Sequence, residues 1–219
     1  MEIIIRPIGK IEKEAIVREG NNKEWVKKAA IGRAAATLFE KKGYLETSLK
    51  DISEAAQLSK GCIYYYFSNK HEILYFILDV YMDNLLEGFE DELRRKPDIY
   101  SKIQFIMHRH LSLYNNKIPE AKAILTDAHN LPYEYYRSIA LKQKKYSQVL
   151  ADVLSDYFDG EMQMDKAKAI SYIVFGMCNS IMHWHDPEGP ITLEELSEIC
   201  FRLFTGGIRQ IKTGQRENA

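Results

Sequence analysis

Apolar residues recur every three or four positions along most of the chain, and this spacing predicts a protein built of α-helices. The first helix is expected over residues 23–42, with Gly43 as its stop. Two short helices follow: one begins at Ser48, whose pattern with Asp51 is typical of a capping box, and the other covers residues 62–67. No segment alternates apolar and polar residues as a half-buried strand does, so the pattern predicts an all-α fold.

After residue 69 the pattern predicts longer helices, which prolines and glycines separate. Their expected ranges are 70–95, 98–115, 133–158, 165–184 and 192–212. Pro119 and Pro132 punctuate the chain after the second of these. The segment 165–184 is apolar nearly all round, and such a helix must be buried on two sides. Residues 1–22 show no sustained period and are interpreted as an N-terminal extension.

Composition adds a core and a local charge to this picture. Of the 219 residues 46% are hydrophobic, enough for a buried core, and the net charge is only −1. The whole molecule therefore has no general attraction to nucleic acid or membrane. Between residues 23 and 70, however, nine lysines and arginines stand against five acidic residues, a net charge of +4. This concentration of positive charge predicts a polyanionic partner for the first third of the chain.

The cysteines and the apolar runs indicate a cytoplasmic protein. Cys62, Cys178 and Cys200 are far apart and odd in number, which favours reduced thiols over a disulfide framework. The apolar residues 3–5 are too few for a signal peptide, and no run approaches the roughly 18 apolar residues of a membrane span. No GxSxG, Walker or dinucleotide motif is present, so we expect neither an enzyme nor a cofactor.

The two short helices, joined by a tight turn with a glycine in a positively charged region, are typical of a helix-turn-helix that binds DNA. If Ile63 and Phe67 hold the second short helix to the core, several polar and aromatic side chains remain on or beside its outward face. These are Lys60, Cys62, Tyr64, Tyr65 and Tyr66. Phenol hydroxyls and an ammonium suit phosphate oxygens, and Gly61 permits a close backbone approach. The alternative is that the tyrosines form only a hydrogen-bonded aromatic surface.

A longer ordered set of residues covers this region. It consists of Gly43-Tyr44, Thr47-Ser48-Leu49-Lys50-Asp51-Ile52, Ser59-Lys60-Gly61-Cys62-Ile63-Tyr64-Tyr65-Tyr66-Phe67 and Asn69-Lys70-His71-Glu72-Ile73-Leu74. This set resembles the DNA-binding signature of the tetracycline-repressor (TetR) family, over about residues 25–78. The chain departs from the family pattern at Cys62, where threonine is usual, and at Gln57-Leu58, where glycine and valine are commoner.

The resemblance implies three N-terminal helices for DNA, a C-terminal domain of about six helices for a ligand, and a homodimer built on the last two helices. The DNA contacts that it implies are Thr47, Ser48, Lys60, Gly61, Tyr64, Tyr65 and Lys70. We therefore divide the chain into an extension (1–22), a helix-turn-helix DNA-binding domain (23–70) and a ligand-binding and dimerisation domain (71–219).

The candidate ligand site lies in the C-terminal domain, around the expected helix 98–115. His110 faces inward there, either as a core histidine that Tyr114 satisfies or as a polar anchor in an apolar pocket. The candidate lining residues are Met107, His110, Tyr114, His129, Tyr133, Tyr136 and Met182. This set suits an elongated, mostly apolar effector. Residues 184–190 loosely resemble the end of the eighth helix in family members that answer fatty acyl or acyl-CoA compounds.

The last two expected helices are the candidates for dimerisation. Their proposed contact residues are Ile173, Gly176, Ser180, Phe204, Gly207 and Ile211. Two-fold symmetry implies a near-palindromic DNA operator. The function expected from all these features is a repressor that leaves its operator when a small apolar molecule binds.

Two other functions stay open. A metal-responsive regulator of the same fold is suggested by the pair His183 and His185, together with the pair His108 and His110, His129 and Cys178. Histidines two apart on a helix point in different directions, unlike the i, i+4 pairs of helical metal sites, so we assign no metal ligands. The other alternative is a helical scaffold that binds only protein, which would need neither the exposed tyrosines nor the local positive charge.

Overall fold

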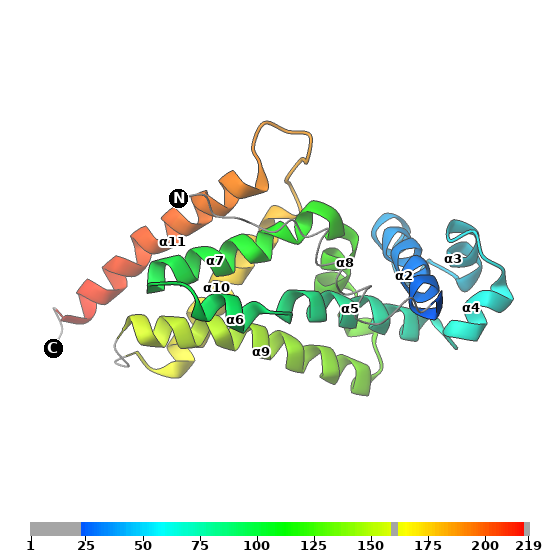
Figure 1. Ribbon diagram of the computed structural model, residues 1–219, viewed down its shortest axis with the longest axis horizontal. Helices are drawn as coiled ribbons and strands as arrows, with labels where there is room; N and C mark the ends of the chain where they lie inside the picture. Colours follow the sequence, from blue (N-terminus) through cyan, green and yellow to red (C-terminus); the bar gives the residue numbers. More distant parts are fainter. Residues whose placement is uncertain (1–22, 159–161, 217–219) are drawn as a thin grey trace.

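The computed structural model describes residues 23–158 and 162–216, except the side chains of residues 115–118 and 209–216 (Figure 1). The extension expected over residues 1–22 lies outside this part. Within it all regular secondary structure is helical, which confirms the predicted all-α fold. The helices are α2 (Lys23–Lys42), α3 (Leu49–Ala55), α4 (Lys60–Tyr66), α5 (Lys70–Leu86), α6 (Phe89–Arg94), α7 (Ile99–Ser112), α8 (Tyr114–Thr126), the 3-10 turn η1 (Ala128–Asn130), α9 (Tyr133–Tyr157), α10 (Met164–Ile181) and α11 (Leu193–Arg216).

The helices α2, α3 and α4 form a small head at one end of the molecule, at the right in Figure 1. One apolar side chain from each helix illustrates their shared core, because Phe39, Ile52 and Ile63 are all buried. Helix α2 has the predicted bounds, and α3 begins directly after Ser48, as its capping pattern predicted. The three-helix arrangement expected of a helix-turn-helix is confirmed.

Helix α5 leaves the head and runs along the C-terminal domain, where it packs against both α2 and α9 (Figure 1). The prediction of one helix over residues 70–95 is wrong, because α5 ends at Leu86 and α6 begins at Phe89. Gly88 separates them with a φ of 64°, in the left-handed region that glycine adopts without a steric penalty. The apolar spacing continues across this break, so periodicity did not reveal it.

The predicted helix over residues 98–115 is also shorter than expected. Helix α7 stops at Ser112, and Tyr114 is the first residue of α8. Pro119 lies inside α8 rather than at a break, where it leaves the helix without one backbone donor. Tyr114 therefore stands at the joint between two helices, not on the stripe of a single one.

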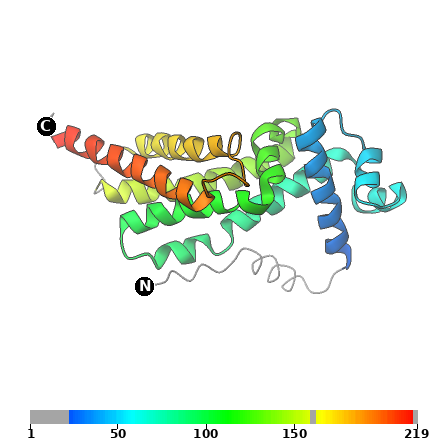
Figure 2. The ribbon, with the colours of Figure 1, turned by 90° about the horizontal axis from the view of Figure 1, so that it is seen from above.

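The helices α7, α9, α10 and α11 make up the body of the C-terminal domain, with α10 and α11 next to each other (Figure 2). Helix α10 turns Val174, Cys178 and Ile181 into the core. Its other face is open, and Ile173 there is 69% exposed. The predicted two-sided burial of this segment is thus met on one side within a single chain. None of the described helices is long and apolar enough to cross a membrane.

Candidate functional site

Helix α4 presents polar and aromatic side chains to solvent and apolar ones to the core. Ile63 is fully buried and Phe67 nearly so, as the pattern predicted. On the opposite side Tyr65 is 77% exposed, and Lys60 and Tyr64 are exposed beside it. We call these three residues the α4 face. Because the buried side chains fix the rotation of the helix, the α4 face is held away from the core.

A local hydrogen bond fixes the start of α4. The Ser59 hydroxyl oxygen accepts from the backbone N–H of Cys62 at 3.1 Å, so the helix begins at Lys60, two residues before the predicted start. Gly61 is exposed in the first turn, and a Cβ there would meet only the Ser59 hydroxyl, at 3.9 Å. The first turn therefore offers open backbone beside the α4 face.

Helix α3 begins with a complete capping box. The Ser48 hydroxyl oxygen accepts from the Asp51 N–H at 3.2 Å, and the Asp51 carboxylate accepts from the Ser48 N–H at 2.8 Å. Lys42 donates to the same carboxylate at 2.7 Å. This bond, followed by those from Ser48, holds the pKa of Asp51 well below its usual range. Ser48 is exposed but already holds the helix start, and its implied DNA contact stays a prediction.

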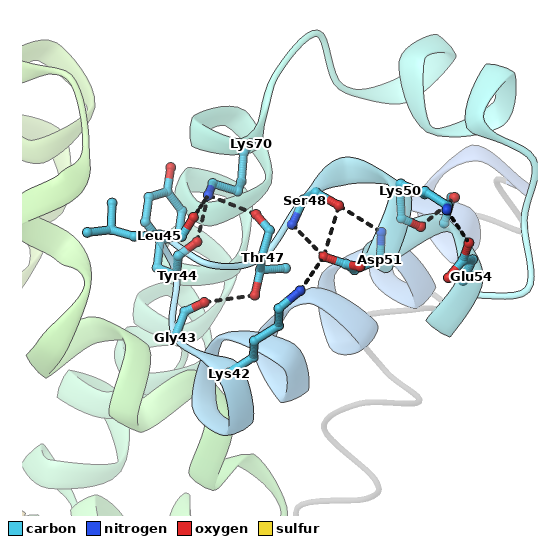
Figure 3. A network of polar contacts seen from close by, with 11 residues as sticks. Lys42, Gly43, Tyr44, Leu45, Thr47, Ser48, Lys50, Asp51, Glu54 and Lys70 are labelled. Carbon is cyan, nitrogen blue, oxygen red and sulfur yellow. Dashed lines mark hydrogen bonds and ion pairs between the residues drawn. The ribbon is translucent and has the colours of Figure 1, made fainter.

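Lys70 is turned inward, toward the loop between α2 and α3 (Figure 3). Its ammonium donates to the carbonyls of Tyr44, Leu45 and Thr47 at 2.6, 3.1 and 2.8 Å. All three ammonium donors are thereby engaged within the chain. Thr47 is buried, and its hydroxyl donates to the Gly43 carbonyl at 2.8 Å. These bonds do not support the implied DNA contacts of Lys70 and Thr47, because in this structure both side chains hold the loop instead of reaching outward.

Tyr66 is less exposed than its predicted place on or beside the outward face of the helix implies. It is half-buried, packs against the core and meets Tyr65 edge to face, with ring centres 4.9 Å apart. Cys62 is half-buried as well. The outward face of α4 is therefore narrower than the sequence suggested.

His110 stands in a buried polar cluster of the C-terminal domain. Its Nε2 lies 2.8 Å from Asn179 Oδ1, and the Tyr114 hydroxyl donates to the same oxygen at 2.8 Å. The Tyr114 hydroxyl also lies 3.0 Å from His110 Nε2. These three residues join the end of α7, the start of α8 and the inner side of α10. One ring nitrogen of His110 is thus satisfied within the core, by Asn179 with Tyr114 beside it, as the core-histidine interpretation predicted.

Two polar atoms of this cluster have no hydrogen-bond partner among the described residues: His110 Nδ1 and the Tyr146 hydroxyl. The two rings are nearly parallel, with centres 5.8 Å apart, and the Phe175 ring lies 5.0 Å from each. Burial lowers the pKa of His110 to about 4, against a smaller raising effect of the Asn179 bond, and burial raises the pKa of Tyr146. Both groups are therefore uncharged at neutral pH.

The other predicted lining residues separate into two groups. Met107 and Met182 are buried, whereas His129, Tyr133 and Tyr136 are exposed. Placing the second group in a pocket was wrong. Helix α9 turns Tyr135 toward α5, where it stacks on Tyr75 with ring centres 4.6 Å apart. Because neighbouring positions on a helix point in different directions, this contact leaves Tyr133 and Tyr136 facing solvent.

Arg109 holds the C-terminal end of α5 and was missed by the sequence reasoning. Its guanidinium donates to the carbonyls of Asn84, Leu85 and Glu87 at 3.3, 3.1 and 2.5 Å. These carbonyls lie beyond or within the last turn of α5, where helix groups lack internal partners. No sequence pattern pointed to this role, because the partners are 22 to 25 residues away.

Tyr146 and Asn179 were missed as well, although each carried a signal. Tyr146 lies among the residues that α9 buries, and a phenol placed there needs a partner for its hydroxyl. Asn179 places an amide in a helix that is apolar nearly all round. The signals were present, but which helices these residues meet depends on the tertiary fold.

Most of the predicted dimer residues lie on the open sides of α10 and α11. Exposed among them are Ile173, Gly176, Ser180 and Gly207, and Phe204 is half-buried. The side chain of Ile211 lies outside the described residues. A Cβ added at Gly176 or Gly207 would meet no described atom within 4 Å.

The histidines of the metal alternative do not come together. His183 is exposed at the end of α10, and His185 donates from Nε2 to the Ile191 carbonyl at 3.0 Å. Within residues 23–158 and 162–216 no group of three or more histidine, cysteine or acidic side chains is placed to hold a metal ion.

Comparisons with known proteins agree with this architecture. Residues 31–75 match the family model of bacterial regulatory proteins, tetR family, and residues 97–208 match that of the tetracyclin repressor-like C-terminal domain. The chain is 23% identical over 188 residues to the HTH-type transcriptional repressor KstR2 of Mycolicibacterium smegmatis, covering 80% of this chain and 87% of that protein.

Two solved structures have a similar fold. A TetR-family transcriptional regulator from Bordetella parapertussis 12822 is 26% identical, with a TM-score of 0.77 over 81% of this chain and 93% of that one. AibR, in complex with isovaleryl coenzyme A and operator DNA, is 23% identical, with a TM-score of 0.72 over 81% of this chain and 97% of that one.

Proposed function

The chain belongs to the tetR family of bacterial regulatory proteins, and from that premise we propose that it is a transcriptional repressor released from DNA by a small apolar effector. A member of this family is a DNA-binding regulator and not an enzyme. The observation that carries the proposal is the α4 face, where Lys60, Tyr64 and Tyr65 stand in solvent above the buried Ile63.

The α4 face suits the backbone of duplex DNA. An ammonium and two phenol hydroxyls are groups that donate to phosphate oxygens, and they set the register of a protein on the duplex. Ser48 and Gly61, exposed at the starts of α3 and α4, extend the proposed contact surface. The net charge of +4 over residues 23–70 adds a general attraction for a polyanion.

The proposed working form is a homodimer through α10 and α11. Beside the small residues Gly176, Ser180 and Gly207, these helices and their ends expose large apolar side chains: Tyr172, Ile173, Trp184, Ile199 and Leu203. Exposed apolar patches on a folded chain mark contact surfaces. A two-fold dimer would carry two α4 faces and so favour a near-palindromic operator.

A single substitution tests the dimer. Because a Cβ at Gly207 meets no described atom within 4 Å, Gly207→Arg is expected to leave the fold intact and to place a charge in the interface. Sedimentation at micromolar concentration should then give dimers for the unaltered protein and monomers for the variant. Monomers in both cases would contradict the proposed interface.

The proposed effector binds beside the buried polar cluster. His110 and Tyr146 supply polar atoms there, and Met107, Phe175 and Met182 are buried apolar residues of the same domain. A few polar groups in apolar surroundings are typical of sites for small molecules. AibR, a protein of similar fold, is described with isovaleryl coenzyme A and operator DNA, which supports an acyl compound as the leading candidate.

Two helices connect the cluster with the head. Helix α8 begins at Tyr114 and packs against α2, where Lys122 meets Glu40 at 2.7 Å. Helix α5 is held at its C-terminal end by Arg109, the sequence neighbour of His110, and at its other end Lys70 holds the loop of the head. An effector that shifts α7 therefore acts on both connections. Release further requires that the effector prefer the arrangement that does not fit DNA.

A salt titration with matched variants tests the DNA contact. Operator duplexes selected from a random pool are titrated by fluorescence anisotropy at several salt concentrations. If Lys60 contacts a phosphate, Lys60→Met reduces the slope of log affinity against log salt by about 1. Tyr65→Ala should lower the affinity with no change in unfolding.

Lys144, exposed on α9 far along the chain from the head, provides the control. Lys144→Met removes the same charge and should leave both the affinity and the slope unchanged. If the two head variants behave like Lys144→Met while remaining folded, the α4 face does not bind DNA.

A further inference from the structure

The buried cluster holds two polar atoms that the described chain does not satisfy. His110 is 7% exposed and Tyr146 is 4% exposed, yet His110 Nδ1 and the Tyr146 hydroxyl have no hydrogen-bond partner among the described residues. Both belong to one stack of rings, since their centres lie 5.8 Å apart and Phe175 contacts both. Buried polar groups in folded proteins nearly always find a partner, so two exceptions in one stack point to a molecule from outside the chain.

The partners of the other ring nitrogen determine what His110 Nδ1 can accept. Asn179 Oδ1 is a carbonyl oxygen and only accepts, and it lies 2.8 Å from His110 Nε2. The proton of the neutral imidazole must therefore be on Nε2. His110 Nδ1 is then a bare acceptor, and it needs a ligand group that donates. The Tyr146 hydroxyl both donates and accepts.

The charges around the cluster disfavour an anion. His110 is uncharged at neutral pH and provides no cation. Arg109 acts electrostatically on Tyr146, but its guanidinium already donates to three carbonyls and contacts Glu92 at 3.4 Å. A carboxylate brought into the stack would lose its hydration, and it has no proton to give His110 Nδ1.

We propose, on the basis of the effector site in the proposed function, that the buried end of the effector carries an uncharged group that donates a hydrogen bond to His110 Nδ1 and accepts one from the Tyr146 hydroxyl. An alcohol and a primary amide have this chemistry. A free carboxylate lacks the donor and carries a charge, and a plain ester or thioester carbonyl lacks the donor. The acyl compound of the proposed function meets this requirement where its buried end carries a hydroxyl or an amide, so the cluster selects a hydroxylated or amidated chain over a free fatty acid.

Four probes of equal chain length test this selection by calorimetry at about pH 7.5: decan-1-ol, decanamide, decanoate and methyl decanoate. The alcohol and the amide are expected to bind at least about tenfold more tightly than the carboxylate, because only the alcohol and the amide satisfy both His110 Nδ1 and the Tyr146 hydroxyl. The affinity of the ester should lie between these two levels. His110→Phe removes the acceptor that distinguishes the alcohol from the ester, so it should remove most of the preference of the protein for the alcohol. Tyr146→Phe should weaken both ligands alike, because each of them accepts from the Tyr146 hydroxyl. Tyr75→Phe, which removes a phenol hydroxyl bonded to Ser138 between α5 and α9, should leave both affinities unchanged.

A spectroscopic readout separates a ligand contact from a change in folding. In protein with nitrogen-15 in its histidines, the Nδ1 resonance of His110 should shift when the alcohol binds and stay in place with the ester. Equal binding of the alcohol and the carboxylate, or no binding by any probe, would overturn the inference. A crystal structure with a water molecule permanently bonded to both atoms would do the same.

The release of operator DNA is measured separately with the same probes. If the alcohol binds selectively but the operator stays bound, the inference stands and the proposed release by an effector fails. If the carboxylate alone releases the operator, the proposed function stands and the inference fails.

Discussion

The head and the buried polar cluster differ in how their polar side chains are hydrogen-bonded. In the head Ser48 bonds with Asp51, and Ser59 with Cys62, so these hydrogen bonds close within one helical turn. In the cluster His110 meets Asn179, 69 residues away, and two polar atoms find no partner in the described chain. Local hydrogen bonds make the head a firm platform whose outer face can bind another molecule. Polar atoms that lack a partner in the core can instead receive hydrogen bonds from, or donate them to, a molecule that enters the core.

The largest effect on stability is expected at Ile63, on which the platform depends. Ile63→Ala removes a fully buried side chain beneath the α4 face, and the expected loss in the free energy of unfolding is about 2 to 5 kcal/mol. Denaturant unfolding measures this loss. Tyr65→Ala on the same helix is the control and should change it by less than about 0.5 kcal/mol. Similar losses for both variants would mean that α4 is not held as described.

The second-largest expected effect is the pH dependence of stability, which differs between the cluster and the head. The pKa of His110 is lowered from 6.5 to about 4, so between these values the unfolded chain binds a proton that the folded chain does not. Stability therefore falls as the pH drops through this window, by at most about 3 kcal/mol. In the head, the pKa of Asp51 is lowered from its ordinary value of 3.8. The stabilisation that its carboxylate provides is therefore lost only when the pH falls below 3.8.

The variant His110→Phe isolates the contribution of the cluster. Unfolding curves between pH 7 and 4 should be flatter for this variant than for the unaltered protein. If the two proteins lose stability in parallel over this range, His110 does not remain neutral in the folded state.

A smaller effect is expected for Lys70, whose side chain binds loop residues 23 to 26 positions away in sequence. Lys70→Met leaves three loop carbonyls without their donor, at an expected cost of about 1 to 3 kcal/mol. DNA affinity should fall because the loop moves, while the salt slope stays unchanged. Lys60→Met should show the reverse, with unaltered stability and a smaller slope. A reduced slope for Lys70→Met would restore Lys70 as a phosphate contact.

The smallest effect compares two tyrosines of the cluster. Tyr114→Phe loses the bond to Asn179 and is expected to cost about 1 kcal/mol. Tyr146→Phe removes a hydroxyl that has no partner among the described residues, so its stability should be unchanged or higher. Thermal unfolding of both variants measures the difference. Equal losses would show that the Tyr146 hydroxyl has a partner, and the contrast between head and cluster would weaken.

The sequence predicted the features that depend on neighbours in the chain. Periodicity gave the bounds of α2, and the Ser48 pattern gave the start of α3. Periodicity also predicted a single helix across Gly88, because the apolar spacing continues on both sides of this residue. The positive φ of Gly88, which ends the helix there, leaves no mark on that spacing. Local information therefore determines where a helix begins more surely than where a long one is interrupted.

The candidate sites divide along the same line. Ile63 and Phe67 were correctly assigned to the core, because their spacing on one short helix left few choices. Tyr133 and Tyr136 were assigned to a pocket in error, because the direction of their turn depends on the packing of α9 against α5. The family resemblance likewise gave a lysine at position 70 but not the direction of its side chain.

The hold of Lys70 on the loop of the head has a consequence for exchanging domains between regulators. A chimaera joined before residue 70 would take Lys70 from one parent and the loop carbonyls that Lys70 binds from the other. The Tyr44 hydroxyl also bonds with His71 Nδ1 at 2.7 Å, so even a junction between residues 70 and 71 would divide a matched pair. The unit to transplant is therefore the head together with the first turn of α5, and its seam belongs after His71.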